Sequence, residues 1–128
     1  MDAAGNRVAL VSGSSLGLGR AIVRRLARDG MSVAVNGRRD DGQAREVARA
    51  IRGDGGVADA FYADVTDEQQ VTNLITAVAD RLGPVDVLVL NATGPQPEAP
   101  LIDVTWDDHL AQLAFFVKSP VLLARAVV

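Results

Sequence analysis

Short apolar runs alternate along the chain with longer segments in which apolar residues recur every three or four positions. The runs predict strands buried on both faces, at residues 7–12, 32–36, 57–63 and 85–91. The longer segments predict helices at residues 17–29, 42–52, 66–82 and from 105 to the last residue. Strands joined by helices of this length form a parallel sheet with right-handed crossovers. The pattern therefore predicts one doubly wound α/β domain over residues 1–128.

The third predicted helix has the clearest boundaries. Thr66, followed three residues later by Gln69, is a capping-box pattern that predicts the start of a helix. Apolar residues then recur at steps of 3, 1, 3, 1 and 3 from Val71 to Leu82, and Gly83 predicts the helix end.

Three glycines lie between the first predicted strand and the first predicted helix, in the segment SGSSLGLGR. Glycine permits positive φ, lets a ligand approach the main chain and lets strand and helix pack closely. A helix N-terminus directs free N–H groups and a partial positive charge at an anion. The alternative is a glycine-rich turn that binds nothing. We expect a phosphate-binding loop in which the Ser14 and Ser15 hydroxyls are additional donors, made by Gly13, Ser14, Ser15, Leu16, Gly17, Leu18 and Gly19.

The spacing of these glycines is neither that of a P-loop nor G-x-G-x-x-G. It resembles the T-G-x-x-x-G-[IL]-G cofactor motif of the short-chain dehydrogenase/reductase family, with Ser12 in place of the threonine. The segment ADV (63–65) is similar to the family's segment after the third strand, whose aspartate, here Asp64, contacts adenine. LNATG (90–94) is similar to the N-N-A-G motif, with Thr93 where the family usually has glycine. LIDVTWDDHL and LLARAV resemble the segments leading into the family's fifth helix.

This resemblance covers essentially the whole chain and implies a Rossmann-type fold truncated after the fifth helix. It implies hydride transfer between a nicotinamide cofactor and a small-molecule carbonyl compound or secondary alcohol, as in 3-oxoacyl reductases. In the family a Tyr-x-x-x-Lys pair is the general acid/base, and a serine orients the substrate. The chain has no such pair: Tyr62, its only tyrosine, lies in a predicted strand, and Lys118, its only lysine, lies in the last predicted helix.

We therefore expect the cofactor-binding half of a longer reductase, with no catalytic residue in this chain. The alternative is a non-catalytic dinucleotide-binding module, or a subunit completed by another chain. Tyr62 is expected in the core or on the strand surface.

The residues after the second predicted strand indicate which dinucleotide binds. Gly37 stands where the family carries the acid that selects NAD, and Arg38 and Arg39 follow it. An arginine near this position accepts the 2′-phosphate of NADP, whose geometry matches a guanidinium. We expect NADP(H) rather than NAD(H), the alternative being that both arginines are solvated loop charges. The other cofactor contacts that the resemblance implies are Asp64, Val65, Asn91, Ala92 and Thr93.

The last predicted helix departs from the family. Phe116 stands where an asparagine normally supports a proton relay, and phenylalanine cannot hydrogen-bond to water. Residues 110–124 are apolar on nearly every side, which predicts burial in the complete fold, although Pro120 should bend the helix. Without the family's remaining half, we expect this helix and the edge of the fourth predicted strand to stay exposed, which favours pairing. The family builds a subunit interface from this helix, which implies a homodimer or homotetramer with Phe115 and Phe116 toward the partner. His109, the only histidine, is expected on the helix surface and not as a ligand or base.

Composition and charge limit the possible partners and the possible chemistry of the protein. The net charge of −3 argues against nucleic acid as a partner, since phosphate binding needs clustered positive charge. The absence of cysteine excludes disulfides and thiolate chemistry. No metal site is expected. We see no signal peptide and no run of about 18 apolar residues to span a membrane, so the expectation is a cytoplasmic protein with no membrane partner.

Overall fold

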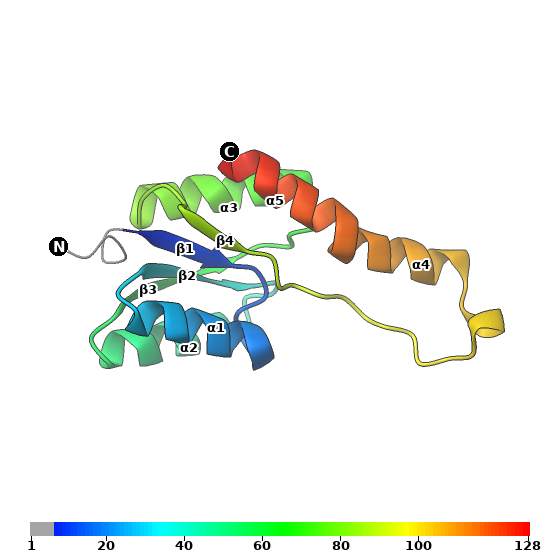
Figure 1. The fold of residues 1–128 in the computed structure, drawn as a ribbon, viewed down its shortest axis with the longest axis horizontal. Helices are drawn as coiled ribbons and strands as arrows, with labels where there is room; N and C mark the ends of the chain where they lie inside the picture. Colours follow the sequence, from blue (N-terminus) through cyan, green and yellow to red (C-terminus); the bar gives the residue numbers. More distant parts are fainter. Residues whose placement is uncertain (1–6) are drawn as a thin grey trace.

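Four strands form one parallel sheet in the computed structural model, which describes residues 7–128 (Figure 1). The strands are β1 (Val8–Val11), β2 (Ser32–Gly37), β3 (Val57–Tyr62) and β4 (Val87–Val89). Their order in the sheet is β3-β2-β1-β4. The chain thus builds outward from β1 to β3 and then returns to the other side of β1. This reversal places the switch point, where ligands bind in such sheets, between β1 and β4. The predicted Rossmann-type fold is confirmed.

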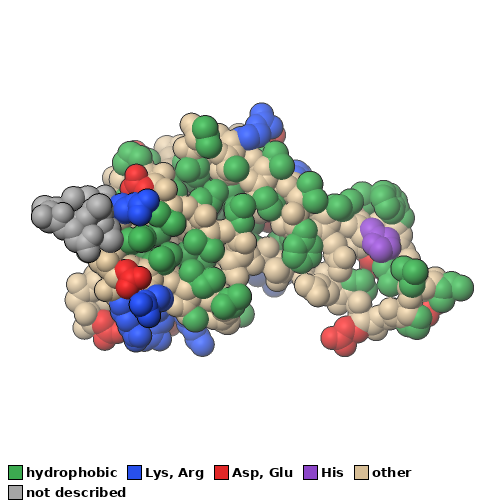
Figure 2. Space-filling model, viewed as in Figure 1, with side chains coloured by type: hydrophobic (Ala, Val, Ile, Leu, Met, Phe, Trp, Pro, Cys, Tyr) green, Lys and Arg blue, Asp and Glu red, His purple; other side chains and the backbone are tan. Residues whose placement is uncertain are grey.

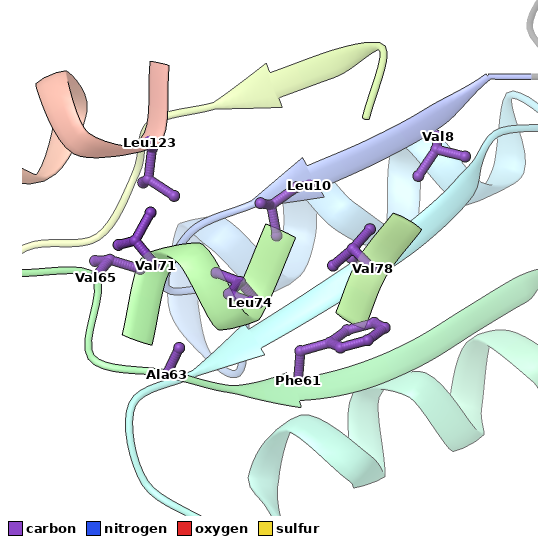
Figure 3. Packing of buried hydrophobic residues seen from close by; sticks show 10 residues of the cluster. Val8, Leu10, Phe61, Ala63, Val65, Val71, Leu74, Val78 and Leu123 are labelled. Carbon is purple, nitrogen blue, oxygen red and sulfur yellow. The ribbon is translucent and has the colours of Figure 1, made fainter. Parts of the chain in front are cut away.

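Helices cover both faces of the sheet. α1 (Gly17–Arg28) and α2 (Gln43–Gly53) lie on one face, and α3 (Glu68–Arg81) and α5 (Ser119–Val127) lie on the other (Figure 1). Alternate residues of β1 supply the two cores, so that Leu10 packs toward α3 while Val11 packs toward α1 and α2. Figure 3 shows the first of these cores, in which Leu123 of α5 points toward Val71 of α3. Burying each such side chain contributes about 1.5–3 kcal/mol.

The N-cap of α3 lies one residue later in the chain than the predicted N-cap, Thr66. Its N-cap is Asp67, whose carboxylate accepts a hydrogen bond from the Gln70 N–H at 3.0 Å. The capping box predicted for Thr66 with Gln69 is therefore wrong. Thr66 forms a tight turn instead, in which its N–H and its hydroxyl donate to one oxygen of Asp64 at 3.0 and 2.6 Å.

The chain after β4 runs away from the sheet as an extended loop and returns as a long helical segment (Figure 1). We call residues 101–127, from η2 to the end of α5, the arm. An extended loop leads to a short 3₁₀ turn, η2 (Leu101–Asp103), and then to α4 (Trp106–Leu113). Thr105 and Asp108 form a reciprocal capping box at the start of α4. A π-helical segment, η3 (Ala114–Lys118), joins α4 to α5. The structure places Pro120 in the first turn of α5, directly after this π-helical segment.

One side of this last helix is exposed in the described part of the chain, as expected where the rest of the family's fold is absent. Leu123 packs into the core, but Leu110, Phe116 and Val117 are about half exposed because no described element covers that side of the arm. Figure 2 shows hydrophobic side chains along it. β4 is likewise only half-buried, because it is an edge strand.

One helical run among the described residues, Trp106–Val127, is long and apolar enough to cross a membrane, with a mean hydropathy of 1.5 over its 18-residue window. The prediction that no such run exists is therefore wrong. Interior helices of soluble proteins meet the same criterion, so we assign no membrane span from it. The prediction of no signal peptide concerns a stretch that begins in residues 1–6, which lie outside the described residues.

Candidate functional site

Each glycine of the β1–α1 loop meets a different constraint. Gly13 has a φ of +65°, and a Cβ there would lie 2.9 Å from the Cα of Ala92, in the loop after β4. Gly17 has a φ of +61°, and a Cβ there would meet nothing within 4 Å, so this turn of backbone faces open space. A Cβ at Gly19 would overlap the carbonyl oxygen of Gly13 and the amide of Asn91. The loop therefore packs tightly on the protein side and leaves its main chain open at Gly17.

Hydrogen bonds join the carboxyl ends of β1 and β4. The Ser12 hydroxyl oxygen accepts from the N–H groups of Asn91 and Ala92, both at 3.0 Å. The Asn91 side chain donates in return to the carbonyl oxygens of Ser12 and Gly13, both at 3.1 Å. The two segments that the motifs singled out are thus held side by side at the switch point.

Asn36, at the end of β2, fixes the loop from the other side. This buried side chain accepts from the Gly13 N–H at 2.9 Å and donates to the carbonyl oxygens of Phe61 and Ala63 at 3.3 and 3.4 Å. Ser14 is also buried: its hydroxyl donates to a carbonyl of β1 at 2.7 Å and accepts from the Asn36 N–H at 2.9 Å. The Ser14 hydroxyl therefore holds the loop and is not directed at a ligand.

A cavity of about 420 Å³ opens beside this loop, a size that suits a small-molecule or cofactor site. Twelve predicted site residues line it: Gly13, Ser15, Leu16, Gly17, Leu18, Gly19, Arg38, Asp64, Val65, Asn91, Ala92 and Thr93. Three predicted residues do not. Ser14 lies beneath the loop, Gly37 packs against Tyr62 and Ala44, and Arg39 is exposed in the loop after β2.

The first turn of α1 is open to this cavity. Leu16 is the N-cap residue, and no side chain caps the helix or places an acid in its first turn. The first N–H groups of a helix have no partner within it, and they carry a partial positive charge. With Gly17 facing open space, the loop provides the features that bind phosphate at a helix N-terminus.

Arg38 and Asp64 face each other across one side of the cavity. Arg38 Nη2 lies 3.6 Å from Asp64 Oδ2, and both side chains reach solvent, so the pair contributes little to stability. Partial burial on its own raises the pKa of the Asp64 carboxyl. The hydrogen bonds from Thr66 and the charges of Arg38 and Lys118 outweigh that effect and hold this pKa below its ordinary value. Asp64 is therefore an anion that is paired with a partly exposed guanidinium in the cavity wall.

Three cavity-lining residues were not predicted: Asn36, Ala63 and Phe115. A polar residue at the end of the apolar run SVAVN was the available signal for Asn36, and Ala63 adjoins a motif residue. No sequence feature indicated that Phe115 lines the cavity, because its position depends on how the arm returns to the sheet. Phe116 is half exposed and does not line the cavity. Tyr62 is half-buried on β3, and its hydroxyl accepts from the Arg45 N–H at 3.3 Å, as expected of a strand-surface residue.

The sheet, the glycine loop and the cavity at the switch point together define a Rossmann-type dinucleotide-binding fold. The family model described as short chain dehydrogenase matches residues 7–128. The chain therefore belongs to the short-chain dehydrogenase/reductase family of oxidoreductases, which use NAD(P).

Similar curated proteins and solved structures agree with this assignment. The short-chain dehydrogenase/reductase homolog YusS of Bacillus subtilis is 41% identical over 88 residues, which cover 69% of this chain and 81% of that protein. The 3β-hydroxysteroid dehydrogenase 1 of Eggerthella lenta is 44% identical over 86 residues, covering 67% of this chain and 33% of the enzyme. A gluconate 5-dehydrogenase from Burkholderia cenocepacia, solved with NADP and tartrate, has a TM-score of 0.86 and 35% identity.

That last match covers 99% of this chain and 48% of the solved chain. A metagenomic short-chain oxidoreductase solved with NADP has a TM-score of 0.85 and 35% identity, over 94% of this chain and 54% of that one. The chain thus spans about half the length of these solved relatives and a third of the Eggerthella enzyme.

Proposed function

We propose that the protein binds NADP(H) in preference to NAD(H), as the cofactor-binding half of a cytoplasmic reductase or dehydrogenase. The reaction would be hydride transfer between the cofactor and a small-molecule carbonyl compound or secondary alcohol, in the manner of 3-oxoacyl reductases. The observation that carries the cofactor preference is Arg38 in the cavity wall directly after Gly37, where no acid is present. The NADP-bound solved relatives support it.

The cavity offers separate groups for each part of a dinucleotide. The open turn at Gly17 and the free N–H groups of α1 would hold the pyrophosphate. Arg38 would pair with a 2′-phosphate, and Asp64 with Val65 would lie against the base. Asn91, Ala92 and Thr93 would form the floor beneath the nicotinamide ribose. The bound nicotinamide would donate or accept the hydride, and the residues of this chain would bind and orient it.

Proton transfer to the substrate oxygen in this family uses a Tyr-x-x-x-Lys pair, and residues 7–128, which the structure describes, place no tyrosine or lysine in the cavity lining. The only tyrosine, Tyr62, lies outside the cavity lining, with its hydroxyl bonded to the Arg45 N–H. This observation favours a second candidate function, a dinucleotide-binding module without hydride chemistry of its own. Binding assays test what the two candidates share, and turnover of carbonyl substrates with NADPH separates them.

The cofactor preference is tested by measuring the dissociation constants of NADPH and NADH for the wild type and for Arg38→Asp. A charge-assisted contact contributes about 1.5–3 kcal/mol, so we expect NADPH to bind about 10- to 100-fold more weakly to the variant and the preference to invert. Arg39→Asp is the matched control, because Arg39 carries the same charge one residue on and does not line the cavity. Unchanged NADPH affinity in Arg38→Asp would rule out the proposed selectivity.

We also propose that a second copy of the chain covers the apolar side of the arm. The arm carries exposed apolar side chains in η2, at both ends of α4 and in η3: Leu101, Ile102, Trp106, Leu113 and Val117. A contiguous apolar surface of this kind marks a protein–protein contact.

A further inference from the structure

Gly94 is required by space and not by conformation. It lies in the loop after β4, and its φ is outside the positive range that favours glycine. A Cβ at Gly94 would nevertheless overlap Cδ2 and Cε2 of the Phe115 ring and lie 3.1 Å from its Cγ. Phe115 belongs to the π-helical segment of the arm, so this ring–backbone contact joins the arm to the loop.

Little else holds this loop. Within the described residues, no hydrogen bond involves residues 93–99, and residues 95–100 are all exposed. The last N–H group of the loop that donates to the Ser12 hydroxyl oxygen is that of Ala92. Beyond that point, the packing of Phe115 on Gly94 is the contact that fixes where the loop starts outward (Figure 1).

The same ring is a wall of the cavity. Phe115 is half-buried and lines the cavity together with Arg38, whose guanidinium carbon lies 6.0 Å from the ring centroid. Phe116, its neighbour, is half exposed and lines no part of the cavity. A change in the position of the Phe115 ring therefore changes both the position of the loop after β4 and the shape of the cavity.

We infer that Phe115 is a positioning residue that seats the loop of residues 92–100 against the arm and thereby sets the width of the cofactor cavity. Loop position and dinucleotide affinity are coupled through its contact with Gly94. Close-packed contacts of this kind transmit changes of a few tenths of an ångström, because interiors have little free volume. The inference rests on the proposed binding of NADP(H) for its ligand, but the loop contact can be tested without any ligand.

The experiment compares Gly94→Ala, Phe115→Ala and the double variant with the wild type. The first readout is the dissociation constant of NADPH, and the second is the rate of cleavage after Glu98 by a glutamate-specific protease. Gly94→Ala should weaken NADPH binding about tenfold, a coupling typical of residues in contact, and speed cleavage. Phe115→Ala should also speed cleavage, because the ring no longer holds the loop.

Size compensation is the decisive comparison. In the Phe115→Ala background the space of the ring is vacant, so adding Gly94→Ala should change NADPH affinity and cleavage less than about twofold. If Gly94→Ala alone fails to fold, restored folding in the double variant supports the inference equally. Effects that simply add in the double variant, or a neutral Gly94→Ala, would overturn it.

Two controls match the substitutions. Gly53→Ala introduces a methyl group where a Cβ meets nothing within 4 Å, and Phe116→Ala removes the adjacent ring, which lies outside the cavity lining. Both should leave NADPH binding and cleavage after Glu98 unchanged. A wild type that does not bind NADPH would refute the proposed function alone, since the cleavage rates would still decide whether Phe115 seats the loop.

Discussion

At the residue scale, alanine substitutions at two glycines of the β1–α1 loop should have different effects, one mainly on stability and one mainly on NADPH binding. Gly13→Ala places a Cβ 2.9 Å from the backbone of Ala92 at positive φ, so both strain and a clash follow. Gly17→Ala meets open space and adds only the strain of a left-handed residue, about 1–2 kcal/mol. Urea unfolding should show a clearly larger loss of stability for Gly13→Ala, while Gly17→Ala weakens NADPH binding. Equal losses in stability would contradict this account of the loop.

Asn36 carries the second prediction at this scale. Its side chain bonds to the Gly13 N–H and to two carbonyl groups at the end of β3, all away from solvent. Asn36→Ala leaves those groups without partners, which costs about 1–3 kcal/mol. The free energy of unfolding in urea measures the loss, and Asn73→Ala, at an exposed position of α3, is a control that should change it little. A loss no greater than that of the control would show that Asn36 does not hold the loop.

These residues show how far the sequence predicts the site. The glycine loop and the resemblance to family motifs together predicted twelve of the cavity-lining residues. They meet in one cavity because the turn after each buried strand reaches the same edge of a parallel sheet. It did not predict that the Ser14 hydroxyl would be taken up by β1 and Asn36, since that depends on the register of neighbouring strands. Phe115 could not be found from spacing at all, because a π-helical segment and a long loop decide where its ring lies.

At the scale of elements, the sequence predicted which segments are helices and which are strands, but it did not predict where α3 begins. Periodicity predicted the four strands and the helices between them, because each apolar stripe must face the sheet. The start of α3 depends on whether Thr66 or Asp67 provides the cap, and both residue types suit that role. Thr66 is instead held by Asp64, so Asp67 caps the helix.

The hydrogen bonds between Thr66 and Asp64 lead to a prediction for the pKa of the Asp64 carboxyl. The pKa of the Asp64 carboxyl lies below 3.8, although partial burial opposes this, because Thr66 and the nearby Arg38 and Lys118 favour the anion. The carboxylate thus stabilises the fold above its ordinary pKa, and that contribution is lost as the pH falls through the lower folded value. Thr66→Val removes one donor, so the pKa of the Asp64 carboxyl should rise toward its ordinary value. The stability that this carboxylate contributes should then be smaller, and its loss in acid should be complete at a higher pH.

Carbon-13 NMR titration of the Asp64 carboxyl measures this pKa directly. Thr72→Val is the control, because the Thr72 hydroxyl donates to the Glu68 carbonyl oxygen and to no carboxylate. The control should leave the Asp64 pKa where it is. A Thr66→Val protein with the wild-type titration curve would show that the hydroxyl does not stabilise the anion.

At the scale of the whole molecule, the sheet is covered on both faces but the arm is not. The arm lies beyond the sheet on the side of β4 and reaches the cavity only through the π-helical segment (Figures 1 and 2). The sequence pattern predicted an apolar helix, and its expected exposure in this chain is confirmed. A hydrophobic pattern shows that a surface needs cover, but it does not show what supplies that cover. The cavity therefore adjoins the apolar side of the arm that no described element covers.

The proposed contact with a second copy makes a prediction that the single tryptophan can report. Trp106 lies on the arm and is 67% exposed, so its fluorescence should shift to the blue as protein concentration rises and the copies associate. Val117→Asp places a charge on the same apolar side and should abolish both the shift and the dimer in sedimentation velocity, because an unpaired buried charge is strongly unfavourable. Val57→Asp, an equally exposed valine at the start of β3, should leave both unchanged. A blue shift that appears with lipid vesicles but not with increasing protein concentration would assign the arm to a membrane surface instead.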